Sequence, residues 1–273
     1  MAEHMQRTQW QQFWDRGGWW RSLLLVAAYY GLYQLGSFAF LPLLQATSDP
    51  ALQIVVGTAL PIVLGALLLI AFAASLRWLP DVFGRQPVTG AGWMWIAVAI
   101  VLVTNVLRFA TIDYGKAGAS IVAAWLFAGL AIGLAEELLT RGFVVRFMRN
   151  AGYREVSVAL VSALLFAAMH VGNMLSGQSL FATLLQLAYT FAFGLCMYLA
   201  LRVTGSLIWP VLLHASTDPS VYLLTQYPGD SSLAKIAELG NVPVILVGIV
   251  LIFFVRGSQG DGRRLNNGAT PAA

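Results

Sequence analysis

Eight long apolar stretches divide this chain, and nearly all of its ionisable side chains lie between them. A helix needs about 20 largely apolar residues to cross the hydrocarbon of a bilayer. Backbone amides in hydrocarbon must also be hydrogen-bonded within their own segment, so such stretches indicate helices. We therefore predict an all-α, polytopic membrane protein. The predicted spans are residues 22–44, 52–76, 91–108, 118–140, 155–171, 180–201, 206–224 and 241–255.

The composition excludes an ordinary soluble enzyme. Hydrophobic residues make up 59% of the 273 residues and charged residues only 10%, whereas a soluble domain carries about 25% charged residues. The length leaves room for a single transmembrane domain over residues 22–256. We expect residues 1–21 to form a cytoplasmic or interfacial segment and residues 257–273, rich in Gly and Asn, to form a flexible tail.

The charge pattern predicts the orientation of the bundle. With both termini in the cytoplasm, most of the 16 Arg and Lys residues fall in cytoplasmic segments, as the positive-inside rule requires. The three in outer loops would be Arg108, Lys116 and Lys235. We therefore read the net charge of +4 as topology, not as nucleic-acid binding. Because arginine greatly outnumbers lysine, we expect a bacterial inner membrane protein.

Five titratable residues fall well inside the apolar stretches. Each costs about 2.5–3.5 kcal/mol in hydrocarbon even on lenient scales, and such residues usually mark functional sites. Two adjacent carboxylates, two imidazoles and a third carboxylate have the chemistry of a hydrolytic site. The five are Glu136, Glu137, His170, His214 and Asp218.

The spacing of these residues predicts how they pair. Glu137 and Arg141 are four residues apart and share one helix face, whereas Glu136 is rotated by about 100° from Glu137. One carboxylate can then be neutralised while the other stays available for chemistry. His214 and Asp218 are also four residues apart, and a helix face with two such polar residues is expected to be turned away from lipid.

The three motifs resemble those of the CAAX protease and bacteriocin-processing family of intramembrane proteases, which includes the type 2 CAAX prenyl endopeptidase. The motifs are Glu136-Glu137-x-x-x-Arg141, Phe166-x-x-x-His170 and His214-x-x-x-Asp218, in this order within about residues 118–224. The resemblance implies an eight-helix bundle with a water-accessible cavity open toward the cytoplasm. It also implies an endopeptidase that acts on a membrane-bound peptide or protein, lipidated or not.

The resemblance also implies roles for these residues. Glu136 would activate a water molecule, which His170 would help to hold. His214 and Asp218 would match the pair that stabilises the oxyanion, and Glu137 with Arg141 would brace the site. The family often has asparagine where this chain has Asp218, and a carboxylate donates a hydrogen bond only when protonated. Asp218 could instead orient His214.

Three alternatives remain open from the sequence. Glu136, His170 and His214 form a two-histidine, one-carboxylate set that could hold zinc, although the HExxH pattern of zinc proteases is absent. We favour a metal-free enzyme with no cofactor. The protein could also be a non-catalytic immunity factor or scaffold. A proton-coupled transporter ranks last, because no internal repeat is visible.

Overall fold

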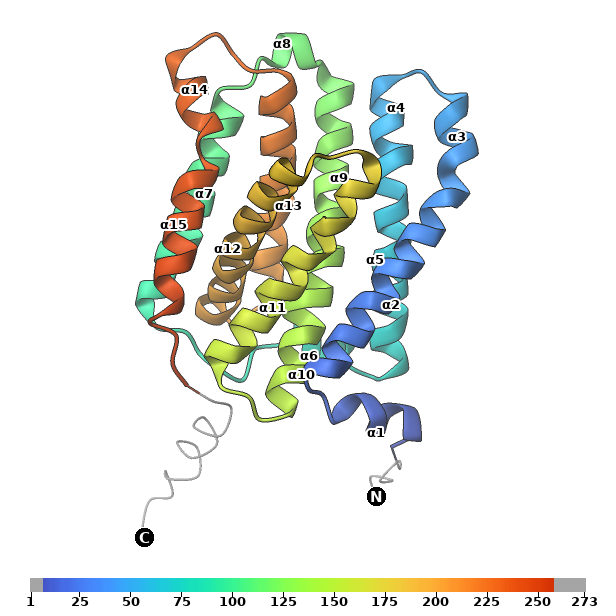
Figure 1. Cartoon of the computed structure of the whole chain (residues 1–273), viewed down its shortest axis with the longest axis vertical. Helices are drawn as coiled ribbons and strands as arrows, with labels where there is room; N and C mark the ends of the chain where they lie inside the picture. The colour runs from blue at the N-terminus through green and yellow to red at the C-terminus, as the bar shows by residue number, and fades with distance from the viewer. Residues whose placement is uncertain (1–6, 258–273) are drawn as a thin grey trace.

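The computed structural model describes residues 7–257, and within them the chain forms helices and no strands. Eight long helices run roughly along the long axis of the molecule, with α11 and α12 inclined to the others (Figure 1). They are α2 (Trp19–Ser37), α5 (Leu60–Ser75), α7 (Trp95–Ala110), α9 (Ala119–Glu137), α11 (Glu155–Met169), α12 (Leu180–Thr204), α13 (Ile208–Gln226) and α15 (Asn241–Ile252). The all-α prediction is confirmed, and each predicted span overlaps one of these helices, although several bounds differ by some residues.

Short helices cap or extend the long ones. They are α1 (Gln9–Asp15), α3 (Leu41–Ala46), α4 (Pro50–Ile54), α6 (Leu79–Phe83), α8 (Tyr114–Ala117), α10 (Val145–Asn150) and α14 (Ser232–Glu238). Two π-helical segments, η2 (Val55–Ala59) and η4 (Leu138–Val144), join short and long helices into continuous rods. Three 3₁₀ segments complete the described elements: η1 (Phe38–Phe40), η3 (Gly92–Met94) and η5 (His170–Ser176).

Seven helical segments of the described chain are long and apolar enough to cross a membrane. They are Trp19–Ala46, Pro50–Ser75, Gly92–Ala110, Ala119–Asn150, Glu155–Ser176, Leu180–Thr204 and Ser232–Ile252. The remaining long helix, α13, packs against α9, α7 and α12. Because His214, Thr217 and Ser220 of α13 are buried, this helix tolerates polar residues that a lipid-facing position would not.

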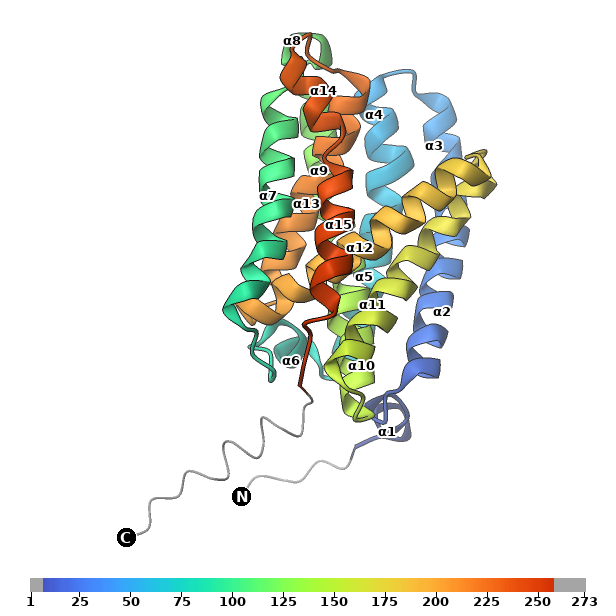
Figure 2. The same cartoon turned by 60° about the vertical axis from the view of Figure 1, so that its left-hand side comes forward.

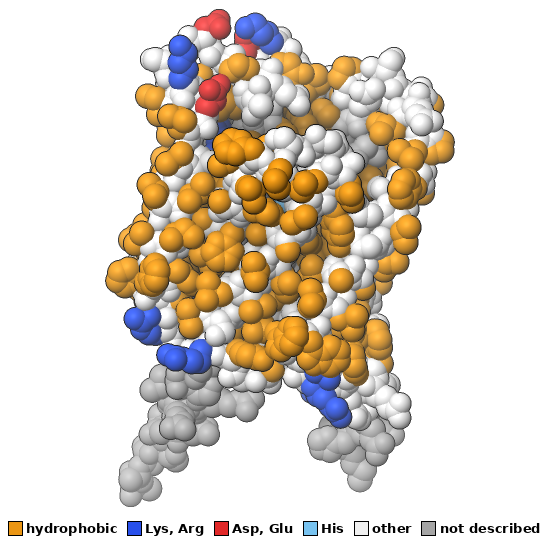
Figure 3. All heavy atoms as spheres, viewed as in Figure 1, with side chains coloured by type: hydrophobic (Ala, Val, Ile, Leu, Met, Phe, Trp, Pro, Cys, Tyr) orange, Lys and Arg blue, Asp and Glu red, His pale blue; other side chains and the backbone are white. Residues whose placement is uncertain are grey.

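The surface has the pattern of a protein embedded in a bilayer. Hydrophobic side chains cover the middle of the visible face, whereas Lys and Arg lie toward both ends and Asp and Glu toward the upper end (Figure 3). α1 and the end of α15 lie at the same end of the bundle (Figures 1 and 2). The cytoplasmic location of that end remains a prediction from the charge pattern, and most of the predicted tail lies outside the described residues.

Glycines bring α13 against α9, the helix that carries the glutamate pair. A Cβ atom on Gly133 would lie 2.6 Å from the backbone oxygen of Val211, and one on Gly129 would lie 2.5 Å from that of Ala215. Only glycine allows the two backbones to approach so closely. This contact sets the distance between the first and third motifs.

A buried ionic cluster fixes the start of α11 between α10 and α12. Glu155 pairs with Arg149 at 2.8 Å and with Arg202 at 3.2 Å, and it also accepts a hydrogen bond from Tyr198. Because Glu155 is fully buried, its charge is compensated only by these partners. The cluster holds the base of α11, and therefore the approach of that helix toward His170.

Candidate functional site

The two adjacent glutamates end α9 and occupy different environments. The side chain of Glu137 is completely buried, whereas that of Glu136 is 21% exposed. The helix continues from here as the π-helix η4, in which the Thr140 hydroxyl donates to the Glu136 carbonyl. Such π-helical segments are rare and frequently occur at functional sites. The predicted separation of the two carboxylates is present in the fold.

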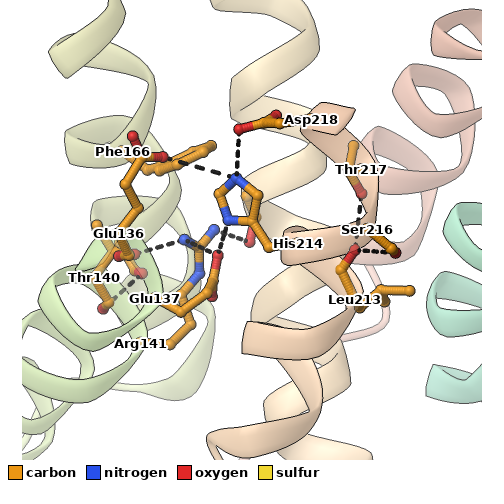
Figure 4. Close-up of polar contacts among 12 residues, drawn as sticks. Glu136, Glu137, Thr140, Arg141, Phe166, Leu213, His214, Ser216, Thr217 and Asp218 are labelled. Atoms are coloured by element: carbon orange, nitrogen blue, oxygen red, sulfur yellow. Dashed lines mark hydrogen bonds and ion pairs between the residues drawn. The ribbon is translucent and has the colours of Figure 1, made fainter. Parts of the chain in front are cut away.

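Glu137 holds two side chains from different parts of the sequence. Its Oε1 accepts a hydrogen bond from Arg141 Nη1 at 3.1 Å and another from His214 Nδ1 at 2.8 Å. Arg141 is fixed further by donating to the carbonyl of Gly194 at 2.9 Å, and its guanidinium lies over the ring of Phe166. Figure 4 shows Glu137 between Arg141 and His214. The predicted Glu137–Arg141 pair is therefore present, and it also anchors the histidine of α13.

His214 lies at the centre of the cluster. Its side chain is 3% exposed and meets the rings of Phe166 and Phe193 edge to face, at 5.6 and 4.9 Å between centroids. Because Nδ1 donates to Glu137, Nε2 is the nitrogen left for chemistry. This atom lies 3.8 Å from Glu136 Oε2 and 3.8 Å from Asp218 Oδ2. One imidazole thus faces three carboxylates.

His170 lies where α11 passes into η5. Its Nδ1 is 3.1 Å from the backbone oxygen of Phe166, and a carbonyl can only accept, so Nδ1 carries the proton of this bond. In the neutral ring, Nε2 is then an acceptor. The ring also packs edge to face on Phe166, at 5.1 Å. Phe166 therefore contacts both histidines and Arg141, which explains why an aromatic residue stands one turn before His170.

A cavity of about 180 Å³ opens beside Glu136. This volume is enough for several water molecules. Glu136 and His170 both line it, together with residues of α2, α5 and η5. Glu136 and His170 thus line the cavity, and His214 and Asp218 adjoin it through the contact of His214 with Glu136.

A second polar layer, on α7, was not predicted from the sequence. Asn105 Nδ2 donates to the hydroxyl groups of Ser216 and Thr217 at 2.9 and 2.8 Å. These two residues lie in the turn of α13 that directly follows His214. Arg108 is only 2% exposed and donates to Asn241 at 2.7 Å. The assignment of Arg108 to an outer loop is therefore wrong: α7 continues to Ala110, and the guanidinium is buried among polar neighbours.

The predicted zinc ligands do not form a compact set. Across residues 7–257, no three His, Cys, Asp or Glu side chains lie close enough together to hold a metal ion. Glu136 and His214 lie 3.8 Å apart, and His170 lines the same cavity as Glu136. A zinc site at these residues would require side chains to move.

Comparison with known proteins agrees with the motifs. The family model described as Type II CAAX prenyl endopeptidase Rce1-like matches residues 118–219, a segment that runs from the start of α9 into α13 and contains all three motifs. This match supports membership of the CAAX protease and bacteriocin-processing family. No curated protein matches the chain.

Proposed function

Because this chain belongs to the CAAX protease family of membrane endopeptidases, we propose that Glu136 is the general base of an intramembrane peptidase. The observation that carries the proposal is the unequal environment of the two glutamates. Glu137 is buried and bonded to Arg141 and His214, whereas Glu136 reaches the cavity with a partly exposed side chain. Only Glu136 is free to take a proton from water.

The first step is attack on the scissile carbonyl. A water molecule in the cavity gives a proton to Glu136, and its oxygen bonds to the carbonyl carbon while the carbonyl electron pair moves onto the oxygen. The Nε2 atom of His170 faces the same cavity and accepts a hydrogen bond from this water. The imidazole of His170 is held in place by its hydrogen bond to the backbone oxygen of Phe166. Such positioning of a catalytic group lowers the activation barrier.

The second step needs a donor for the oxyanion. With Nδ1 already donated to Glu137, a protonated His214 presents Nε2–H toward the reacting centre. Glu137 lies 2.8 Å from Nδ1 and Asp218 lies 3.8 Å from Nε2, so a carboxylate stands beside each ring nitrogen while Glu136 holds the proton from water. Asp218 then supports the charge of His214 without itself donating to the oxyanion. Collapse of the intermediate breaks the C–N bond, and the leaving amine takes the proton that Glu136 received.

We propose further that the enzyme needs no metal and that its substrate is a protein or peptide of the membrane in which it resides, a bacterial inner membrane. Glutamate, imidazole and water suffice for the steps above. Removing one oxyanion donor in other hydrolases lowers kcat by about 10²–10³, and His214→Ala should do the same here or worse.

The test compares membrane-associated peptides in cells that produce the wild type, Glu136→Gln or Glu238→Gln. Glu238 is an exposed carboxylate of α14, so Glu238→Gln makes the same substitution at a position outside the site. We expect new peptide termini with the wild type and the Glu238 variant and none with Glu136→Gln. New termini that persist with Glu136→Gln would overturn the role of Glu136 as the base. An immunity phenotype that survives Glu136→Gln, with no new termini in any of the three strains, would show a non-catalytic scaffold.

A further inference from the structure

The cavity beside Glu136 has a wall that lies outside the segment matched by the family model. This wall is one face of α2, which carries Tyr29, Tyr30, Tyr33 and Gln34 toward the cavity. On the opposite side of the same helix Leu32 and Leu35 are exposed, 53% and 68%, as expected for a lipid-facing surface. Over residues 29–35, α2 therefore carries polar groups on the side that meets the cavity and leucines on the opposite side.

Glycines make room for two of the phenol groups. A Cβ atom on Gly172 of η5 would lie 1.5 Å from Tyr30 Oη, and one on Gly65 of α5 would lie 2.8 Å from Tyr29 Oη. Either position would have to rearrange to accept a side chain. The fold is thus shaped to bring tyrosine hydroxyls into the cavity.

The polar groups of this wall are unused within the protein. In the described chain, neither the phenols of Tyr29, Tyr30 and Tyr33 nor the Gln34 amide hydrogen-bonds another residue. Opposite them lies Asn173 of η5, whose side chain is held by Gln186 at 2.9 Å. Free donors and acceptors facing one space inside a bilayer protein are costly unless water or a ligand satisfies them.

The chemistry of the wall fits a polypeptide backbone. A peptide that enters the bilayer loses the hydrogen bonds of water, and each unsatisfied amide costs several kcal/mol. Its scissile segment must also be extended to reach Glu136, so its own helix cannot satisfy those groups. Hydroxyl and amide side chains can both donate and accept, as a backbone requires. Among the described residues that line the cavity, none is Lys or Arg.

We propose that Tyr30, Tyr33 and Gln34 of α2, facing Asn173, bind the backbone of the substrate in an extended, uncharged segment. The proposal rests on the peptidase function above and adds how the substrate is recognised. The site selects a stretch of chain by its amide groups and does not select a C-terminal carboxylate by charge. These residues position the substrate and take no part in proton transfer.

The experiment uses the full protein in lipid vesicles and a synthetic library of uncharged, N-acylated peptides. Peptides cleaved by the wild type but not by Glu136→Gln are kept, and an absence of such peptides contradicts the peptidase function itself. For a cleaved peptide, KM and kcat are then compared in Tyr33→Phe, Tyr30→Phe and the control Tyr153→Phe, which changes a phenol outside the membrane spans. Each cavity variant should raise KM about three- to tenfold with little change in kcat, because it removes uniform binding.

Two altered substrates complete the test. Replacing one backbone amide near the scissile bond by an ester should raise KM for the wild type but less for the variant that has lost the matching hydroxyl. A C-terminal carboxamide should be cleaved within about twofold of the free carboxylate, since no charge-assisted bond is lost. Unchanged KM in the cavity variants, equal ester effects in all proteins, or a large loss with the carboxamide would each overturn the proposal while leaving the peptidase function standing.

Discussion

The two neighbouring glutamates provide the sharpest prediction, because the same conservative change should have opposite consequences at adjacent positions. Glu137 and Arg141 have side chains that are 0% exposed, so no water can replace either partner. Removing one member of a buried ion pair costs about 3–5 kcal/mol, since the other charge remains buried and uncompensated. We expect Glu137→Gln to lower the free energy of unfolding by about 3 kcal/mol, the lower end of this range, because the glutamine amide oxygen can still accept a hydrogen bond from Arg141.

Glu136→Gln should behave differently. Its carboxylate already reaches the cavity, and its charged contact with His214 is at 3.8 Å, so its loss should change the free energy of unfolding by less than about 1 kcal/mol. Activity should nevertheless disappear. Glu137→Gln should lose both stability and activity, because His214 loses its anchor.

The assay is denaturant unfolding of the purified protein in micelles, followed by the fluorescence of its 9 tryptophans. The double variant Glu137→Gln, Arg141→Met should recover part of the lost stability, since no charge is then left unpaired. Equal stability of the two single glutamine variants would refute the reasoning. So would a double variant that is less stable than Glu137→Gln alone.

Three further predictions follow from the site. Gly133→Val should force α13 away from α9 and lower the free energy of unfolding by about 1–3 kcal/mol through overpacking. The control Gly31→Ala should leave that free energy unchanged, because nothing lies within 4 Å of the added atom. Equal losses of stability in the two variants would contradict this prediction. Asp218→Asn should keep the stability but lower kcat, because a neutral amide supports the charge of His214 less well than a carboxylate 3.8 Å away. A kcat equal to that of the wild type would show that the charge of Asp218 is not used. Dialysis against a chelator should leave activity unchanged, and activity that is lost and then restored by zinc alone would require a metal mechanism.

Local spacing made much of the fold and the site predictable. The apolar stretches specify the helices, because in hydrocarbon the backbone amides of such a segment must be hydrogen-bonded to one another. The pairing of Glu137 with Arg141 follows from the geometry of a single helix, and the near approach of His214 and Asp218 has the same origin. These predictions needed no knowledge of how the helices pack.

Contacts between helices could not be predicted in the same way. That Glu137 would bind His214 of α13 depends on the close approach at Gly133, which spacing along one helix does not reveal. Arg108 was misplaced because a charge near the end of an apolar stretch looks the same whether it faces water or a polar interior. The tyrosines of α2 gave no signal, since aromatic residues are common in membrane spans.

The central claim is that Glu136 activates water to hydrolyse a peptide bond inside the membrane. The most direct test incubates the vesicle-bound protein with its peptide substrate in H₂¹⁸O and measures the masses of the products by mass spectrometry. The account predicts one ¹⁸O in each new C-terminal carboxylate with the wild type and with Glu238→Gln, and no cleavage with Glu136→Gln. Labelled products formed at the wild-type rate by Glu136→Gln would contradict it.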